Sequence, residues 1–333
     1  MLRAGLNLAL INLYLYTMLG LYTVTKHSTS RGWQPLVLAL GAGVLLLANS
    51  WPVWGAEPAP ESQVSSTQSA ILNATQNATQ TRTTVERGLE IFQEADRRQS
   101  GFVDMLVDLK MILRNRKGNA VSRDLELRQL EVPEGGDKLM VVFNTPKAIA
   151  GTALLSHGQI TREDDQWLYL PALKRVKKIA SRNRSGPFLG SEFSYEDLST
   201  QEVEKYTYNY LREEACGDQN CFVVERRPGP NLYSGYLRQV FWLDTEHYRT
   251  QKVDYYNRGD RLTKTLVGSD FVVFDVPAVD PASGSAKIWK AGRMLMTNHV
   301  TKKSTELTWD AYRFGVGLSA ERDLSVTSLR RVR

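Results

Sequence analysis

The stretch FVDMLVDLKMILRNRKGN, residues 102–119, alternates apolar and polar side chains with a period of two. Its apolar positions on one face are Met105, Val107, Leu109, Met111 and Leu113. That period is typical of a β-strand with one buried face, and the RKGN sequence at its end is typical of a turn. The stretch therefore predicts a long strand that leads into an antiparallel partner.

The same alternation recurs through the rest of the chain. Leu125 and Leu127 alternate with charged residues directly after the turn. Further alternating runs contain Phe241 and Leu243, Met294 and Met296, and Leu307, Trp309 and Ala311, with turn sequences at PEGGD, NRGD and PASGS. Long alternating strands joined by short turns indicate an antiparallel sheet with one apolar face.

One long helix is predicted in front of this sheet. Apolar residues recur there at helical spacing, at Val85, Leu89, Phe92 and Ala95, and Thr83 with Glu86 forms a capping-box pattern. A single long helix is little cover for a large apolar face, so the sheet has to curl on itself, pack the helix inside, or hold an apolar ligand. A closed barrel filled with side chains would satisfy the same pattern.

The first 56 residues form a hydrophobic segment. Residues 33–54 are uncharged, follow Lys26, His27 and Arg31, and end near small residues in VWGAEP, which predicts a signal peptide over about residues 26–56. Residues 4–24 form a second uncharged stretch that is long enough to cross a bilayer. Either translation begins after this second stretch, or the two segments anchor the protein as a helical hairpin. Both interpretations place residues 57 onward outside the cytoplasm.

The segment from residue 57 to residue 81 is rich in Pro, Ser, Thr, Gln and Asn and has little to bury. This composition predicts a flexible linker. We therefore expect one folded domain over residues 82–333.

Two cysteines, Cys216 and Cys221, flank the turn-forming tetrapeptide GDQN. In an oxidising compartment we expect them to form a disulfide that closes a hairpin. Two free thiols or a redox pair are the alternatives, although four intervening residues do not match the spacing of thioredoxin-like motifs.

Sequence motifs for catalysis are lacking. The four histidines, His27, His157, His247 and His299, form no short-range metal pair, and the chain contains no G-x-S-x-G elbow, Gly-rich phosphate loop or H-E-x-x-H motif. The carboxylates of REDD (residues 162–165) and YED (residues 195–197) could serve acid–base chemistry, but such clusters are usually loops or helix caps. We expect a protein that is not an enzyme and that holds no cofactor or metal.

A cluster of six basic side chains lies within eleven positions, at Lys174, Arg175, Lys177, Lys178, Arg182 and Arg184. A nucleic-acid interface is the least favoured interpretation, because 42 basic and 36 acidic residues nearly balance and no stacking aromatics interleave with the cluster. The cluster is then either a solvated loop or a contact with anionic lipid headgroups or an acidic transporter surface.

Residues 164–198, DDQWLYLPALKRVKKIASRNRSGPFLGSEFSYEDL, resemble the signature of a bacterial family of outer-membrane lipoprotein-sorting proteins with a LolA-like fold. The resemblance spans about residues 84–315, through FVDMLVDLKMILRNRKGN, LMVVFNTPKAIAGTALL, CFVVERRP and RMLMTNHVTKKSTELTW. The tail GLSAERDLSVTSLRRVR departs from the family pattern.

The resemblance implies a mainly β (α+β) fold: an unclosed antiparallel half-barrel with one long N-terminal helix and short helices covering the concave face. It also implies a monomeric periplasmic carrier that binds acyl chains of lipids or lipoproteins. Its expected partners are an inner-membrane exporter of the resistance-nodulation-division type, an outer-membrane acceptor, or both. The alternatives are a non-carrying accessory or scaffold protein of such an exporter and, third, a lipid hydrolase.

Five residues are predicted to contact lipid: Trp167, Tyr169, Leu170, Phe188 and Phe193. Both faces of the strand QWLYL are apolar, so at least one face should meet a helix or lipid. Phe188 and Phe193 flank Gly190 in a loop that could form a lid or rim. Ordinary core packing is the alternative for each residue. Met105, Met111, Met294 and Met296 could give a deformable lining, or belong to a plain core.

Overall fold

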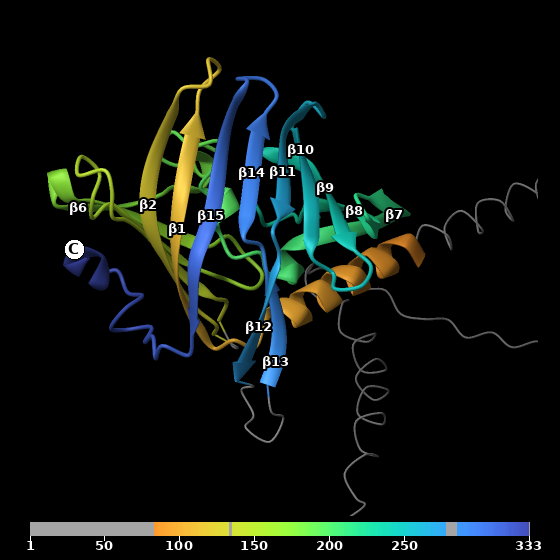
Figure 1. Ribbon diagram of the computed structural model, residues 1–333, viewed down its shortest axis with the longest axis horizontal. Coiled ribbons are helices and arrows are strands. Elements are labelled where there is room, and N and C mark those ends of the chain that lie inside the picture. The colour runs from red at the N-terminus through yellow and green to blue at the C-terminus, as the bar shows by residue number, and fades with distance from the viewer. Residues whose placement is uncertain (1–82, 133–134, 278–284, 333) are drawn as a thin grey trace, which may run out of the picture. The chain divides into compact units, whose positions relative to one another are not determined.

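Fifteen strands and one long helix dominate the residues that the computed structural model describes, which are 83–132, 135–277 and 285–332 (Figure 1). The predicted hydrophobic segment and linker over residues 1–81 lie outside this part of the chain. No helix among the described residues is both long and apolar enough to span a membrane. The strands are β1 (Asp104–Arg114), β2 (Ala120–Leu130), β3 (Lys138–Phe143), β4 (Ala153–His157), β5 (Asp165–Leu170), β6 (Arg175–Lys178), β7 (Tyr206–Cys216), β8 (Gln219–Pro228), β9 (Tyr236–Asp244), β10 (Thr250–Asn257), β11 (Leu262–Ser269), β12 (Val272–Pro277), β13 (Ser285–Lys290), β14 (Arg293–Asn298) and β15 (Lys303–Phe314).

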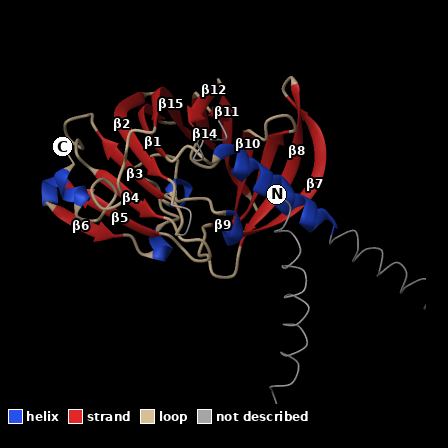
Figure 2. Cartoon of the chain, turned by 90° about the horizontal axis from the view of Figure 1, so that it is seen from below, coloured by secondary structure: helices blue, strands red, loops and turns tan. Residues whose placement is uncertain are grey.

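Thirteen of these strands form one antiparallel sheet in the order β6-β5-β4-β3-β2-β1-β15-β14-β11-β10-β9-β8-β7. The edge strands β6 and β7 do not pair with each other, so the sheet stays open. Figure 2 shows it curving from β6 round to β7, with the helix and loops on the inside of the curve. The predicted fold class is confirmed: a mainly β, unclosed antiparallel half-barrel.

The predicted alternation in β1 is confirmed. Met105, Val107, Leu109 and Met111 are buried, and a tight turn with Gly118 at φ +86° leads into β2. In the β1–β2 register Leu109 lies opposite Leu125, so the apolar positions of the two strands share one face.

The long helix covers residues 83–99 and lies on the concave side (orange in Figure 1). Its buried positions are Gly88, Ile91, Phe92 and Ala95. Val85 and Leu89, predicted on the buried face, are instead 43% and 37% exposed. The reason is Gly88, where a Cβ would lie 2.8 Å from the backbone nitrogen of Tyr210, so the helix meets β7 along its glycine side.

The connection between β6 and β7 has to cross the sheet, because these two consecutive strands are its opposite edges. Residues 179–205 make this crossing on the concave side, and we call them the inner cover. They contain the predicted short helices as three 3-10 turns, η2 (Ser181–Asn183), η3 (Glu196–Leu198) and η4 (Val203–Lys205). A further turn, η1 (Pro171–Leu173), joins β5 to β6.

The other face of β3, β4 and β5 is covered by residues 315–332, which we call the outer cover. Leu324 and Leu329 of this segment are fully buried, the latter in the 3-10 turn η6 (Ser328–Arg331). The segment is fixed at its start by the buried carboxylate of Asp104, which accepts hydrogen bonds from the backbone N–H groups of residues 316, 317 and 318. The tail that departs from the family pattern thus has a defined packing role.

Candidate functional site

A cavity of about 510 Å³ lies among the concave face of the sheet, the long helix and the inner cover. Its lining is mainly apolar and comes from many strands, including Met105, Leu109, Leu125, Leu139, Val141, Leu243, Val253, Leu266, Leu307 and Trp309. Pockets for small ligands are typically about 300–1,000 Å³ and mostly apolar. The cavity therefore has the size and chemistry of a site for an apolar ligand.

Strand alternation explains why these residues face the cavity. In β3, Leu139 and Val141 point inward and line it, while Met140 and Val142 point to the outer face. The hairpin of β12 and β13 adds Trp289 to the lining just before the chain re-enters the main sheet. The sheet supplies most of the wall, and the helix and inner cover supply the rest.

Phe188 and Phe193, which the sequence predicts to contact lipid, both line the cavity. Their loop is tight, because the N–H of Phe188 donates to the carbonyl of Phe193 at 2.7 Å. The loop is also fastened to the far half of the sheet, where Glu192 N–H donates to Thr305 Oγ1 at 2.9 Å and Asn298 Nδ2 donates to the Glu192 carboxylate at 2.6 Å. The loop is therefore a fixed part of the cavity wall and, as it stands here, no open lid.

Trp167, Tyr169 and Leu170 do not line the cavity, which corrects the prediction for these three residues. Trp167 and Tyr169 face the outer side, where they pack in the cluster that contains Leu324 and Leu329. Leu170 packs at the margin of the main core. The reason is the outer cover, whose position the sequence pattern did not reveal and which fills the face that lipid was expected to fill.

The four methionines, which the sequence left open between a cavity lining and plain core, take both roles. Met105, Met111 and Met294 line the cavity, whereas Met296 is fully buried in the core. Methionine is flexible and polarizable, so three of them give this wall an adaptable surface.

Five of the six clustered basic residues are exposed: Lys174, Arg175, Lys177, Lys178 and Arg182. They lie on or next to β6, the edge strand of the sheet. Only Lys178 among these five forms a described ion pair, with Asp165 at 2.7 Å. Arg184 is a correction, because it is 6% exposed and its guanidinium lies 3.5 Å from the Glu163 carboxylate inside the fold.

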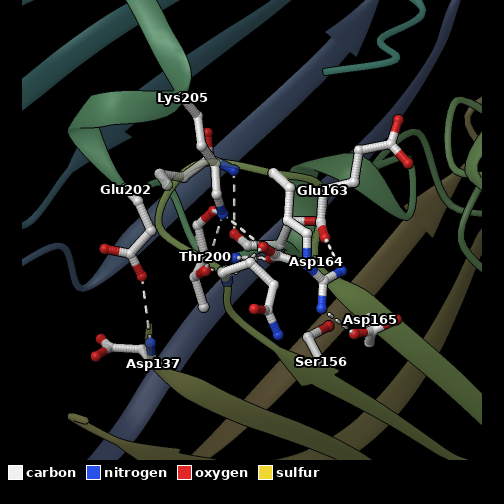
Figure 3. Close-up of polar contacts among 12 residues, drawn as sticks. Asp137, Ser156, Glu163, Asp164, Asp165, Thr200, Glu202 and Lys205 are labelled. Atoms are coloured by element: carbon white, nitrogen blue, oxygen red, sulfur yellow. Dashed lines mark hydrogen bonds and ion pairs between the residues drawn. The ribbon is translucent and has the colours of Figure 1, made fainter. Parts of the chain in front are cut away.

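The REDD carboxylates hold the inner cover in place (Figure 3). Asp164 forms a buried ion pair with Lys205 and accepts the backbone N–H of Thr200 at 2.8 Å. Glu163 accepts the backbone N–H of Tyr233 at 2.7 Å and also binds the hydroxyl of Ser181. Asp164 and Glu163 therefore have a structural role, which is to hold the inner cover against the sheet.

The described histidines also have structural partners. His157 Nε2 lies 2.7 Å from the carbonyl oxygen of Leu324, and His299 Nε2 lies 2.8 Å from the hydroxyl of Thr265. His247 stacks on Trp289 with ring centroids 4.7 Å apart. Among residues 83–132, 135–277 and 285–332, no cluster of three or more His, Cys, Asp or Glu side chains is arranged to hold a metal ion.

Cys216 and Cys221 are joined by a disulfide across the β7–β8 turn. Cys221 is fully buried on the outer face with Val223, Val240 and Trp242. The bond lies away from the cavity and closes the end of a hairpin, where it pins the pairing of the edge strand β7.

Sequence reasoning missed the charged groups of the cavity wall, which include Asp96, Arg226, Arg249 and Lys290. Burial raises the pKa of Asp96 to about 6 and lowers the pKa of Lys290 to about 8. One signal for Arg226 was present in FVVERR: if Phe222 and Val224 face inward on a strand, Arg226 does too. The other groups reach the cavity through tertiary packing that the local pattern does not encode.

Comparison with known proteins places the chain in a family. A family model described only as an uncharacterised protein matches residues 135–331, more than half of the chain. A domain from Vibrio parahaemolyticus named for outer membrane lipoprotein sorting is 46% identical, with a TM-score of 0.68 over 74% of this chain and 100% of that one. No curated protein matches the chain.

Two further solved structures share the fold. A DUF1329 family protein from Desulfovibrio piger is 25% identical, with a TM-score of 0.66 over 74% of this chain and 99% of that one. A LolA superfamily protein from Nitrosomonas europaea is 16% identical, with a TM-score of 0.55 over 73% of this chain and 98% of that one, a likeness of fold alone. The chain has a LolA-like fold and, by its 46% identical relative, belongs to the family of outer-membrane lipoprotein-sorting protein domains.

Proposed function

We propose that the protein is an exported, monomeric carrier that binds acyl chains of lipids or lipoproteins in the concave cavity. The observation that carries this proposal is the mainly apolar cavity of about 510 Å³ that the sheet, helix and inner cover border. Covering one methylene contributes about 0.8 kcal/mol, so a 16-carbon chain would gain on the order of 12 kcal/mol at most on leaving water. Carrying requires no nucleophile, metal or cofactor.

The same proposal includes the cellular setting. Residues 26–56 would direct export, residues 57–81 would act as a linker, and the domain would work in the periplasm, tethered if residues 4–24 are retained. It would receive or deliver its cargo at an exporter of the resistance-nodulation-division type, an outer-membrane acceptor, or both. The name of the Vibrio relative supports a role in outer-membrane lipoprotein sorting.

The decisive experiment is recovery of the protein from its native host under mild conditions, followed by organic extraction and mass spectrometry. We expect acyl lipid in about equimolar amount, and fresh binding of a fluorescent fatty acid after delipidation. A protein that is free of lipid and also ignores added acyl ligands would support the accessory or scaffold function. Turnover of ester substrates that is lost on changing His157, His247 or His299 would support a hydrolase.

The exposed basic residues are proposed to contact anionic headgroups or an acidic partner. Charge reversal at Lys174, Arg175, Lys177 and Lys178 should weaken association with anionic vesicles, because each contact contributes about 1 kcal/mol. The thermal unfolding midpoint should change little, since exposed side chains at a sheet edge contribute little to stability. Unchanged vesicle association, measured by co-sedimentation, would leave the cluster as a solvated edge that prevents strand pairing.

A further inference from the structure

Arg226 is a buried cation in the wall of an apolar cavity. It follows Phe222 and Val224 on the inward face of β8, at a position where an apolar residue would continue the core. Its side chain is enclosed, with the residue only 4% exposed, and it lines the cavity. A charge in such a place is costly unless it is paired, so its partners are informative.

The described partners of Arg226 are all neutral. Its guanidinium lies 4.0 Å from the ring centroid of Tyr206 and 4.5 Å from that of Phe241. Nε and Nη2 donate to the Gln239 side-chain oxygen at 3.0 and 2.6 Å, and Nη2 also donates to the Gln201 oxygen at 2.7 Å. Within the part of the chain that the structure describes, Nη1 has no hydrogen-bond partner and no carboxylate lies within 4.0 Å of the guanidinium.

Three other charged groups of the wall, Arg249, Asp197 and Lys290, have partners of a different kind. Arg249 is paired with Asp244 at 2.8 Å. Asp197 accepts hydrogen bonds from the Ser194 N–H at 2.7 Å and the Tyr236 hydroxyl at 3.1 Å. Lys290 keeps more exposed surface than Arg226, and its ammonium lies 3.4 Å from the carbonyl oxygen of Gln99 and 4.7 Å from the ring centroid of Phe102. Arg226 is therefore a deeply buried cation of the wall whose Nε and Nη2 are held by hydrogen bonds and whose Nη1 is free to donate.

Resting on the carrier function above, we propose that Arg226 binds the oxyanion of an anionic acyl lipid whose chain fills the apolar cavity. The two glutamines and two rings hold the guanidinium plane in place, so Nη1 is left to donate to a ligand oxygen. The two N–H groups of Nη1 can each donate a charge-assisted hydrogen bond to an oxygen of a carboxylate or a phosphate. The ligand class is thus an acyl chain with a single anionic head.

The test measures binding of three ligands to the full-length protein by displacement of a neutral fluorescent acyl probe. The ligands are palmitate, palmitoyl lysophosphatidate and neutral monopalmitoylglycerol, which separate carboxylate, phosphate and uncharged heads. Arg226→Gln should weaken the better of the two anionic ligands roughly tenfold to a hundredfold and leave the neutral ligand unchanged. Arg226→Lys, which keeps the charge but loses the planar guanidinium that the glutamines and rings hold in place, should give an intermediate loss.

Two controls keep the result specific. Arg227→Gln changes the exposed neighbour, which is paired with Glu225 at 2.6 Å on the opposite face, and should change no affinity. Lys290→Gln tests another cation of the wall, one that has no described ion pair. Retained binding of the neutral ligand shows that the Arg226 variants are folded.

The outcomes separate the two proposals. If the wild-type protein binds neutral and anionic ligands but Arg226→Gln changes none of them, or weakens all three equally, the headgroup site is overturned and the carrier function stands. A selective loss in Lys290→Gln alone would also overturn it. If the wild-type protein binds none of the three ligands, the carrier function fails together with this inference.

Discussion

Strands β3, β4 and β5 are apolar on both faces, and the two faces are covered in different ways. On the outer face Met140, Val142 and Leu155 are packed against a short tail that places Leu324 and Leu329 among them with no exposed surface. On the inner face Leu139 and Val141 line the cavity, whose other walls include the helix and the inner cover. Both faces of the strands are apolar, so whether a face becomes packed core or cavity wall depends on its cover.

Truncating a leucine on each face should give the largest contrast. Leu329→Ala removes a fully buried side chain and should lower the free energy of unfolding by about 2–5 kcal/mol. Leu139 already borders the cavity, so Leu139→Ala should lower the free energy of unfolding by less than about 2 kcal/mol while changing acyl-ligand affinity. Urea unfolding and ligand titration check both values, and equal losses of stability would show that the inner face is packed like the outer one.

Enlarging an alanine on each face sharpens the comparison. Ala153→Leu adds volume to the closed outer cluster and should destabilise the fold by about 1–3 kcal/mol without changing ligand affinity. Ala95→Leu extends from the helix into the cavity and should leave stability nearly unchanged while lowering affinity for the longest acyl chains most. A destabilising Ala95→Leu that binds ligand normally would contradict the assignment of this space.

The two covers should respond to pH with opposite signs. Burial raises the pKa of Glu196 in the inner cover to about 7, so the folded state keeps a proton that the unfolded chain releases near pH 4.5, and stability falls as pH rises between these values. Burial lowers the pKa of His157 beneath the outer cover, so stability falls as pH drops below about 6.5. Each slope is at most about 1.4 kcal/mol per pH unit, the value for a difference of one bound proton.

Single substitutions separate these contributions. Glu196→Gln should gain stability relative to the wild type as pH is raised from 5 to 7.5, whereas His157→Gln should gain as pH is lowered from 7 to 5. Urea midpoints measured across this range give the two differences. Differences that stay constant with pH would show that neither group changes its pKa on folding.

The sequence predicted what depends on local pattern and left out what depends on long-range cover. Alternation predicted β1 and its turn correctly, and helical spacing located the long helix. That same spacing chose Val85 and Leu89 for burial, because an apolar count gives no weight to Gly88, whose lack of a side chain brings the helix onto β7.

The candidate site shows the same limit. Phe188 and Phe193, predicted to contact lipid, line the cavity and also pack in the main core, and their contact with lipid stays a prediction. Trp167 and Tyr169 were assigned to lipid because the strand is apolar on both faces, and nothing local indicates that a tail about 150 residues later covers one face. Arg226 was readable from strand register, but its significance depends on Gln201 and Gln239, which only folding brings to it.

The seam between β1 and β15 sets the order in which such a protein can assemble. These two strands lie next to each other in the middle of the sheet, yet Asp108 and Arg313, which form an ion pair across it, are 205 positions apart. Contacts of such long range are slow to form, because the intervening chain has to be ordered before they contribute. The wall of the cavity is continuous only when this seam is closed, so a chain that has not yet folded β15 onto β1 would have no complete cavity.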